Sequence, residues 1–181
     1  MVRVKICGIT NLEDALAAAE AGADAVGLVF APSPRRVDPE TARRIVAALP
    51  PMVMAVGVFA DQPPAYVCQV RGYCGLHAVQ LHGREDPLQV RELGRGVIKA
   101  LATDPTHPPQ PDAYPQATLL LDAHHPQARG GTGTTCDWNL ARSLARRQDV
   151  GSAAPPGPGP GCSPYSGRFS WLSPFQQYLS G

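Results

Sequence analysis

Lys5-Ile6-Cys7-Gly8-Ile9-Thr10 ends the first apolar run of the chain and leads directly into the helix-forming sequence that begins at Asn11. These residues predict the end of a strand in a parallel sheet, where Gly8 lets the backbone turn away. Cys7 would then lie at the rim of the sheet. Because α/β enzymes keep their reactive side chains at this rim, the stretch points to both a fold class and a candidate site.

The rest of the chain repeats this order of an apolar run, a loop and a helical pattern. After the strand over residues 2–7, further strands are predicted over 24–30, 52–59, 76–81, 96–101 and 117–122. Helices are predicted over 11–22, from 38 onward, and over 61–70, 85–93 and 137–147. Prolines at 105, 108, 109, 111 and 115 exclude a continuous helix between the last two strands. A strand spacing of about 20 to 30 residues favours parallel connections over hairpins.

Two α/β folds fit this alternation, an open doubly wound sheet and a closed (βα)8 barrel. The first loop has one glycine where a dinucleotide-binding fingerprint needs three, which argues partly against the open sheet. Residues 1–147 keep the regular pattern and form one predicted domain. Residues 148–181 are low in complexity and rich in Gly, Pro and Ser, so we expect a disordered tail. The abrupt change of composition there indicates a shifted reading frame.

Composition narrows the classes of function. The 181 residues carry a formal charge of +1, which gives no broad electrostatic surface for nucleic acid or an anionic membrane. No apolar run is long enough for a membrane span, and the N-terminus lacks a signal-peptide pattern. The five cysteines are irregularly spaced with no CxxC pair, which predicts free thiols in a cytoplasmic protein without a zinc site.

Several polar residues at predicted strand ends could carry chemistry. Cys7 could be a nucleophile or a general base, or simply a small buried hydrophobic residue. Asp122 ends an apolar strand, where a carboxylate is costly unless it is used or paired, although it could also cap the next loop. Arg35 could hold a carboxylate through its two-pronged guanidinium, or be a solvated loop residue. Gln80 and His82 could line the site or cap the strand.

Other candidate groups give weaker signals. Lys5 lies two residues before Cys7 on the same face of the strand and could provide a cation near the thiol. Gly130 and Gly131 belong to a glycine-rich loop just before a predicted helix, whose backbone amides could face an anion. His124 and His125 have no third ligand nearby in the sequence and make a poor metal site.

Taken together and in this order, the strand-end motifs resemble the phosphoribosylanthranilate isomerase family over residues 1–147. Each motif is short, but their joint occurrence, one after each strand, is highly specific. They are Lys5-Ile6-Cys7-Gly8-Ile9-Thr10, Gly27-Leu28-Val29-Phe30 with Ser33-Pro34-Arg35, Gly57-Val58-Phe59, Gln80-Leu81-His82-Gly83, Leu121-Asp122, and Gly130-Gly131-Thr132-Gly133 with Asp137-Trp138.

The resemblance implies a (βα)8 barrel that catalyses the Amadori rearrangement of N-(5-phosphoribosyl)anthranilate in tryptophan biosynthesis, without a metal or organic cofactor. It implies that Asp122 is the general acid, that Cys7 is the general base, and that Arg35 holds the anthranilate carboxylate. Lys5, Gln80, His82, Gly130 and Gly131 would contact the small-molecule substrate. We expect a monomer or a homodimer, which could self-associate through open barrel edges.

The resemblance stops where the composition changes. Family members continue with two further strands whose Gly-Gly and Ser-Ser-Gly turns hold the substrate phosphate, and residues 148–181 contain neither turn motif. The sequence therefore predicts an incomplete barrel of about six βα units, with weak or no turnover. Two alternatives stay open here: a non-catalytic fragment, and the related phosphosugar isomerase of histidine biosynthesis. The second uses an aspartate as its first-strand base, so Cys7 argues against it.

Overall fold

A computed structural model describes residues 3–103 and 110–123 of the protein. Six strands alternate with four α-helices along these residues, as the sequence predicts. One short 3-10 helix lies in the proline-rich connection, where the sequence predicts no continuous helix. Their bounds are β1 (Lys5–Cys7), α1 (Leu12–Glu20), β2 (Ala25–Val29), α2 (Pro39–Ala48), β3 (Met54–Phe59), α3 (Pro64–Cys74), β4 (Ala78–Leu81), α4 (Pro87–Glu92), β5 (Val97–Thr103), η1 (Pro111–Ala113) and β6 (Thr118–Ala123). The glycine-rich loop, the helix predicted over 137–147 and the predicted tail lie outside the described residues.

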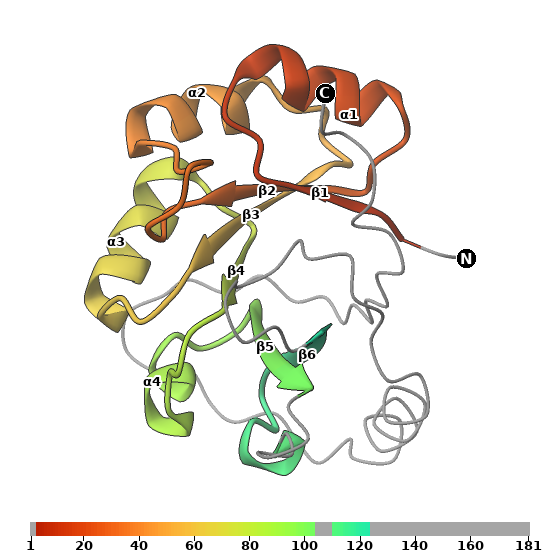
Figure 1. The fold of residues 1–181 in the computed structure, drawn as a ribbon. Coiled ribbons are helices and arrows are strands. Elements are labelled where there is room, and N and C mark those ends of the chain that lie inside the picture. The colour runs from red at the N-terminus through yellow and green to blue at the C-terminus, as the bar shows by residue number, and fades with distance from the viewer. Residues whose placement is uncertain (1–2, 104–109, 124–181) are drawn as a thin grey trace.

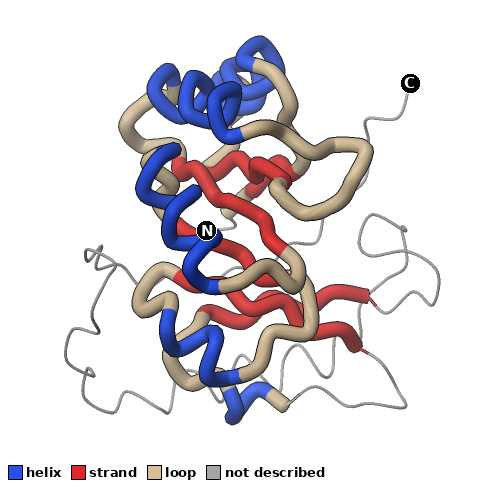
Figure 2. Tube along the Cα trace, turned by 90° about the vertical axis from the view of Figure 1, so that its left-hand side faces the viewer, coloured by secondary structure: helices blue, strands red, loops and turns tan. Residues whose placement is uncertain are grey.

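The strands form one parallel sheet in the order of the sequence, from β1 to β6. The sheet curls, and the helices lie along its outer side (Figures 1 and 2). In a doubly wound sheet the strand order reverses at a switch point, whereas in a (βα)8 barrel each strand pairs with the next along the chain. The unbroken order therefore selects the barrel type, of which the described residues form a curled half.

The two faces of the sheet pack differently because successive side chains of a strand point to opposite sides. Side chains on the outer face meet the helices in a large apolar core that includes Leu28, Phe59 and Val79. On the inner face, Ala25 and Val56 lie in one small cluster, and Val29 and Val58 lie in another against Cys7. The second cluster therefore places Cys7 on the inner side of the curl.

The helix starts follow local sequence. The Asn11 side chain accepts a hydrogen bond from the Asp14 backbone N–H at 2.8 Å and caps α1. Asp38 caps α2 in the same way, with Pro39 in its first turn.

Two predicted helices have different bounds from those observed. The helix predicted over 61–70 runs from Pro64 to Cys74 and ends at Gly75, whose φ of 72° supplies a left-handed cap. The helix predicted from Glu85 begins at Pro87, because Asp86 accepts hydrogen bonds from the Leu88 and Gln89 backbone N–H groups. Glu85 is therefore a loop residue.

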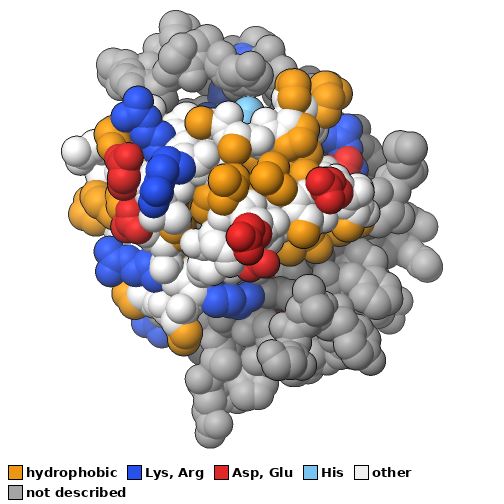
Figure 3. Space-filling model, turned by 90° about the horizontal axis from the view of Figure 1, so that it is seen from above, with side chains coloured by type: hydrophobic (Ala, Val, Ile, Leu, Met, Phe, Trp, Pro, Cys, Tyr) orange, Lys and Arg blue, Asp and Glu red, His pale blue; other side chains and the backbone are white. Residues whose placement is uncertain are grey.

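The helical layer leaves some large apolar side chains at the surface, among them Leu12 of α1, Met52, and Leu88 of α4. Looking onto the α1–α2 end, Figure 3 shows hydrophobic side chains gathered among acidic and basic ones. Within the described residues, no helix is both long and apolar enough to cross a membrane.

Candidate active site

Cys7 ends β1 on the inner side of the sheet, where it is half-buried and forms no disulfide among the described residues. Its neighbour in the sheet is Gly27 of β2, and the Cys7 side chain lies over that residue. A Cβ atom added to Gly27 would lie 2.7 Å from the Cys7 sulfur and 3.1 Å from its Cα. The glycine therefore creates the space that the thiol occupies. As predicted, the thiol lies at the carboxyl end of a strand.

Arg35, the predicted carboxylate-binding residue, lies beside Cys7. Its Nη1 donates a hydrogen bond to the Cys7 carbonyl oxygen at 3.2 Å, while its side chain is exposed. The chain passes through Gly8 with a φ of +90°, and a Cβ there would lie 2.7 Å from the Arg35 Cδ and Nη1 atoms. The absence of a side chain at Gly8 thus allows both the left-handed backbone turn and the close approach of the Arg35 guanidinium.

A row of hydrogen-bonded side chains crosses the inner face from β1 to β6. The Lys5 ammonium on β1 donates to the Gln80 side-chain oxygen on β4. Gln80 Nε2 lies 3.2 Å from His82 Nδ1, and His82 Nε2 lies 2.9 Å from Asp122 Oδ2 on β6. Gln80 is buried, whereas His82 and Asp122 are about a quarter exposed, at 24% and 25%. Four predicted site residues are therefore brought together; we call them the Lys5–Asp122 row.

The direction of each hydrogen bond in this row follows from its first member. An ammonium group can only donate, so it fixes the Gln80 oxygen toward Lys5 and the Gln80 NH₂ group toward His82. His82 Nδ1 is then the acceptor, and the ring proton of neutral His82 is on Nε2, where it is donated to the Asp122 carboxylate. The row therefore fixes both the tautomer of His82 and its partner.

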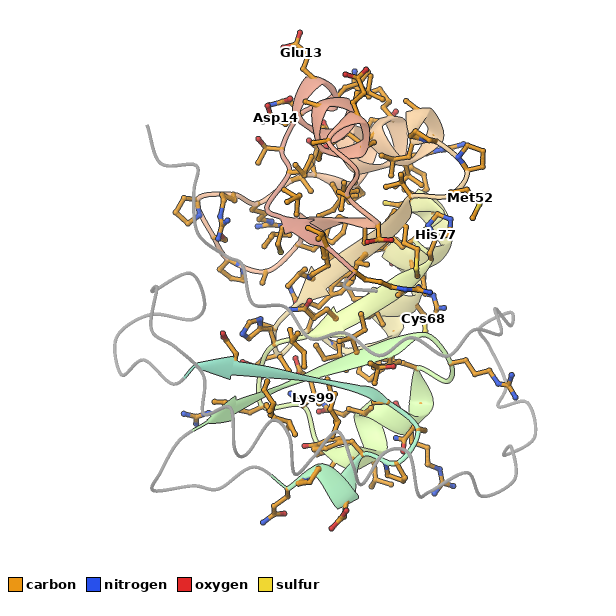
Figure 4. All side chains as sticks on the ribbon, turned by 90° about the vertical axis from the view of Figure 1, so that its right-hand side faces the viewer. Glu13, Asp14, Met52, Cys68, His77 and Lys99 are labelled. Carbon is orange, nitrogen blue, oxygen red and sulfur yellow. The ribbon has the colours of Figure 1, made fainter. Side chains whose placement is uncertain are left out.

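A second polar cluster, which the sequence analysis missed, lies behind the rim on the outer side of β5. Lys99 of β5 is labelled in Figure 4. It forms an ion pair with Glu85, with Nζ and Oε2 2.8 Å apart. Tyr114 donates a hydrogen bond to the Glu85 carbonyl oxygen at 3.1 Å. Burial and the nearby Glu85 and Asp86 carboxylates raise the pKa of Tyr114.

The predicted substrate-binding residues Gly130 and Gly131, and the His124-His125 pair, lie outside the described residues. In the part of the chain that the structure describes, no group of three or more His, Cys, Asp or Glu side chains is arranged to hold a metal ion.

Comparison with known proteins identifies the family of the chain. The family model described as N-(5'-phosphoribosyl)anthranilate (PRA) isomerase matches residues 4–153. The chain belongs to this family. N-(5'-phosphoribosyl)anthranilate isomerase from Pelobacter propionicus is 47% identical over 152 residues, which are 83% of this chain and 73% of the relative. The family match passes a few residues beyond the domain boundary predicted at 147.

Solved PRA isomerase structures share the fold. The Thermotoga maritima enzyme superposes with a TM-score of 0.70 at 44% identity, over 81% of this chain and 73% of that one. A second structure holds reduced 1-(o-carboxyphenylamino)-1-deoxyribulose 5-phosphate; it superposes with a TM-score of 0.65 at 42% identity, over 81% and 72% of the two chains. Because the chain belongs to the PRA isomerase family, the resemblance seen in the strand-end motifs is confirmed. The same finding disfavours the alternative of a phosphosugar isomerase of histidine biosynthesis.

Proposed function

We propose that the chain catalyses the rearrangement of N-(5-phosphoribosyl)anthranilate to 1-(2-carboxyphenylamino)-1-deoxyribulose 5-phosphate, a step of tryptophan biosynthesis. The observation that carries the proposal is the Lys5–Asp122 row, which joins the acid on β6 to the strand that bears Cys7. Family membership and a relative that holds a reduced form of this product support it.

Asp122 is the proposed general acid. In its protonated form it gives a proton to the ribose ring oxygen, the bond from that oxygen to C1′ breaks, and a protonated Schiff base forms between C1′ and the anthranilate nitrogen. The carboxylate that remains accepts the His82 Nε2–H bond, 2.9 Å away in the structure. This hydrogen bond stabilises the charge that develops on Asp122 as the ring opens.

Cys7 is the proposed general base. Its thiolate removes the proton from C2′, and the electron pair moves to neutralise the Schiff base as an enolamine. The enolamine then gains a proton at C1′ and loses its hydroxyl proton, which yields the ketone. Lys5, two residues away on the same face of β1, provides a positive charge near the thiolate.

Binding is assigned to the polar groups around these two residues. The exposed Arg35 guanidinium is the proposed partner of the anthranilate carboxylate, because it combines charge with a planar fork. Lys5, Gln80 and His82 are proposed to contact the ribose portion. Gly130 and Gly131 are proposed to contact the substrate through their backbone amides. The proposal includes a cytoplasmic location, supported by Cys7, Cys68 and Cys74, which form no disulfide among the described residues.

The test is product formation by the purified full chain, followed through the fluorescence of the anthranilate group and confirmed by mass and NMR spectra of the product. We expect slow turnover that Cys7→Ala reduces by on the order of 10²-fold or more, because general-base catalysis is lost. Cys68→Ala is the matched control, since Cys68 is a half-buried thiol on α3 and should leave the rate unchanged. Equal rates for wild type and Cys7→Ala would contradict the proposal.

A further inference from the structure

The Glu85–Lys99 ion pair lies outside the interior of the curled sheet, so it does not face the proposed substrate site. Both side chains are only 3% exposed. Burying two charges is costly, and apolar residues of similar size usually pack as stably as a buried pair. Packing alone therefore does not account for the pair, and its hydrogen bonds to the backbone show what it holds.

Glu85 and Lys99 together bind the loops that follow β3 and β4. The Glu85 carboxylate accepts hydrogen bonds from the Asp61 backbone N–H at 2.9 Å and from the Gly83 N–H at 3.0 and 3.1 Å. Lys99 donates to the Gly83 carbonyl oxygen at 2.8 Å. Both polar groups of the Gly83 peptide backbone are thus held by one buried charge pair anchored on β5.

The backbone at Gly83 also approaches the preceding loop closely. Asp61 accepts a hydrogen bond from the Arg84 N–H at 2.6 Å, and a Cβ added to Gly83 would lie 2.6 Å from the Asp61 backbone nitrogen. Asp61 itself has a φ of +61°. The position of residues 83–85 is therefore fixed on several sides.

Gly83 directly follows His82, whose ring lies between Gln80 and Asp122. We propose that Glu85 and Lys99 are positioning residues that hold the His82 imidazole against the Asp122 carboxylate. Their action passes through the Gly83 backbone, because neither side chain belongs to the Lys5–Asp122 row. This inference rests on the proposed function, since it assigns the support of the proposed acid.

The experiment measures the ring nitrogens of His82 by NMR in the ¹⁵N-labelled full chain, with His82→Asn used to assign the signals. Wild type should show a single tautomer with the proton on Nε2. Glu85→Gln, and the double variant Glu85→Gln/Lys99→Met, which leaves no unpaired buried charge, should show averaged tautomers because the ring is no longer fixed. Their kcat/KM should fall by up to about 100-fold, mainly in kcat.

Asp38→Asn is the matched control. It makes the same acid-to-amide change at a carboxylate that accepts a backbone N–H bond, but it caps α2 and has no contact with the β4 loop. It should lower the melting temperature and leave the His82 tautomer unchanged. Because two variants are measured, a failure of one to fold still leaves the other as a test.

A single Nε2–H tautomer in a folded Glu85→Gln or double variant would overturn the inference. If the His82 signals of the variants show averaged tautomers but the wild-type protein makes no product, the positioning role stands and the proposed function fails. If wild type turns over and the tautomer is insensitive to both variants, the function stands and the positioning role fails.

Discussion

At the scale of single residues, the site depends on where side chains are absent as much as on where they are present. Gly27 lies next to Cys7 in the sheet, and the thiol occupies the volume that any larger residue at position 27 would fill. In the same way, the Arg35 side chain occupies volume that a larger residue at position 8 would fill. Both glycines adjoin proposed catalytic or binding groups.

Gly27→Ala should therefore displace the thiol. The new methyl group would be 2.7 Å from the Cys7 sulfur and 3.1 Å from its Cα, too close for both to stay in place. We expect the free energy of unfolding to fall by about 1 to 3 kcal/mol, as in other overpacked cores, and turnover to fall with it. Chemical denaturation and the rate assay measure the two effects.

Gly72→Ala is the control for that substitution. Gly72 is in α3, and apart from its chain neighbours and the α3 backbone, no atom of the described residues lies within 4 Å of the position that its Cβ would take. Alanine there should stabilise the protein by about 0.5 to 1 kcal/mol, because glycine is unfavourable inside a helix. A Gly27→Ala protein as stable as wild type would show that the thiol has a second position available.

The meeting of the candidate residues at one rim was predictable from sequence, but their contacts with one another were not. Cys7, Gln80, His82 and Asp122 each end an apolar run, and parallel strands bring such ends to one rim. Which side chain bonds to which depends on strand register and on the curl of the sheet, which apolar patterns do not specify.

The Glu85–Lys99 pair escaped prediction for a different reason. Glu85 was expected in the first turn of the helix predicted over 85–93, where an acidic residue is common. The available signal was Lys99 inside the apolar run 96–101, because a buried cation requires a buried anion.

At the scale of secondary-structure elements, the Cys74 thiol forms a contact between α2 and α3. Cys74, the last residue of α3, is buried, and its sulfur donates a hydrogen bond to the Pro39 carbonyl oxygen of α2 at 3.3 Å. Burial raises the pKa of the Cys74 thiol, and the nearby Arg43 guanidinium opposes this only in part. The contact therefore favours the protonated thiol.

This contact makes stability depend on pH on the alkaline side. A thiol with a raised pKa in the folded state stabilises the fold fully below its unfolded pKa, about 8.5, and loses that effect as pH rises through the folded pKa. We expect the stability advantage of wild type over Cys74→Ala to shrink between about pH 8 and pH 10. Urea denaturation of both proteins across this range measures it. A constant difference would mean that Cys74 does not titrate differently on unfolding.

The prediction of elements succeeded where apolar runs were long and failed at helix ends. All six predicted strands are present, because each combines an apolar run with a turn signal. The end of α3 was placed four residues early, since its apolar pattern fades before Gly75, and only the backbone angle of Gly75 shows where the helix stops.

At the scale of the whole molecule, the described strands form one curled parallel sheet, with the proposed base on β1 and the proposed acid on β6. The Lys5–Asp122 row joins the two ends of this sheet through β4. Several expectations concern residues beyond this part and stay predictions: the boundary at residue 147, the disordered tail, the missing phosphate turns and the weak turnover that would follow. The oligomeric state, monomer or homodimer, is also still a prediction.

The most direct test of the account is the kcat/KM of Asp122→Asn for N-(5-phosphoribosyl)anthranilate, measured beside wild type and Asp112→Asn. Asp112 lies in the exposed segment η1 and provides the same change of side chain away from the rim. The account predicts a loss on the order of 10²- to 10⁴-fold for Asp122→Asn, because the general acid is removed, and wild-type values for Asp112→Asn. An Asp122→Asn protein with wild-type kcat/KM would contradict it.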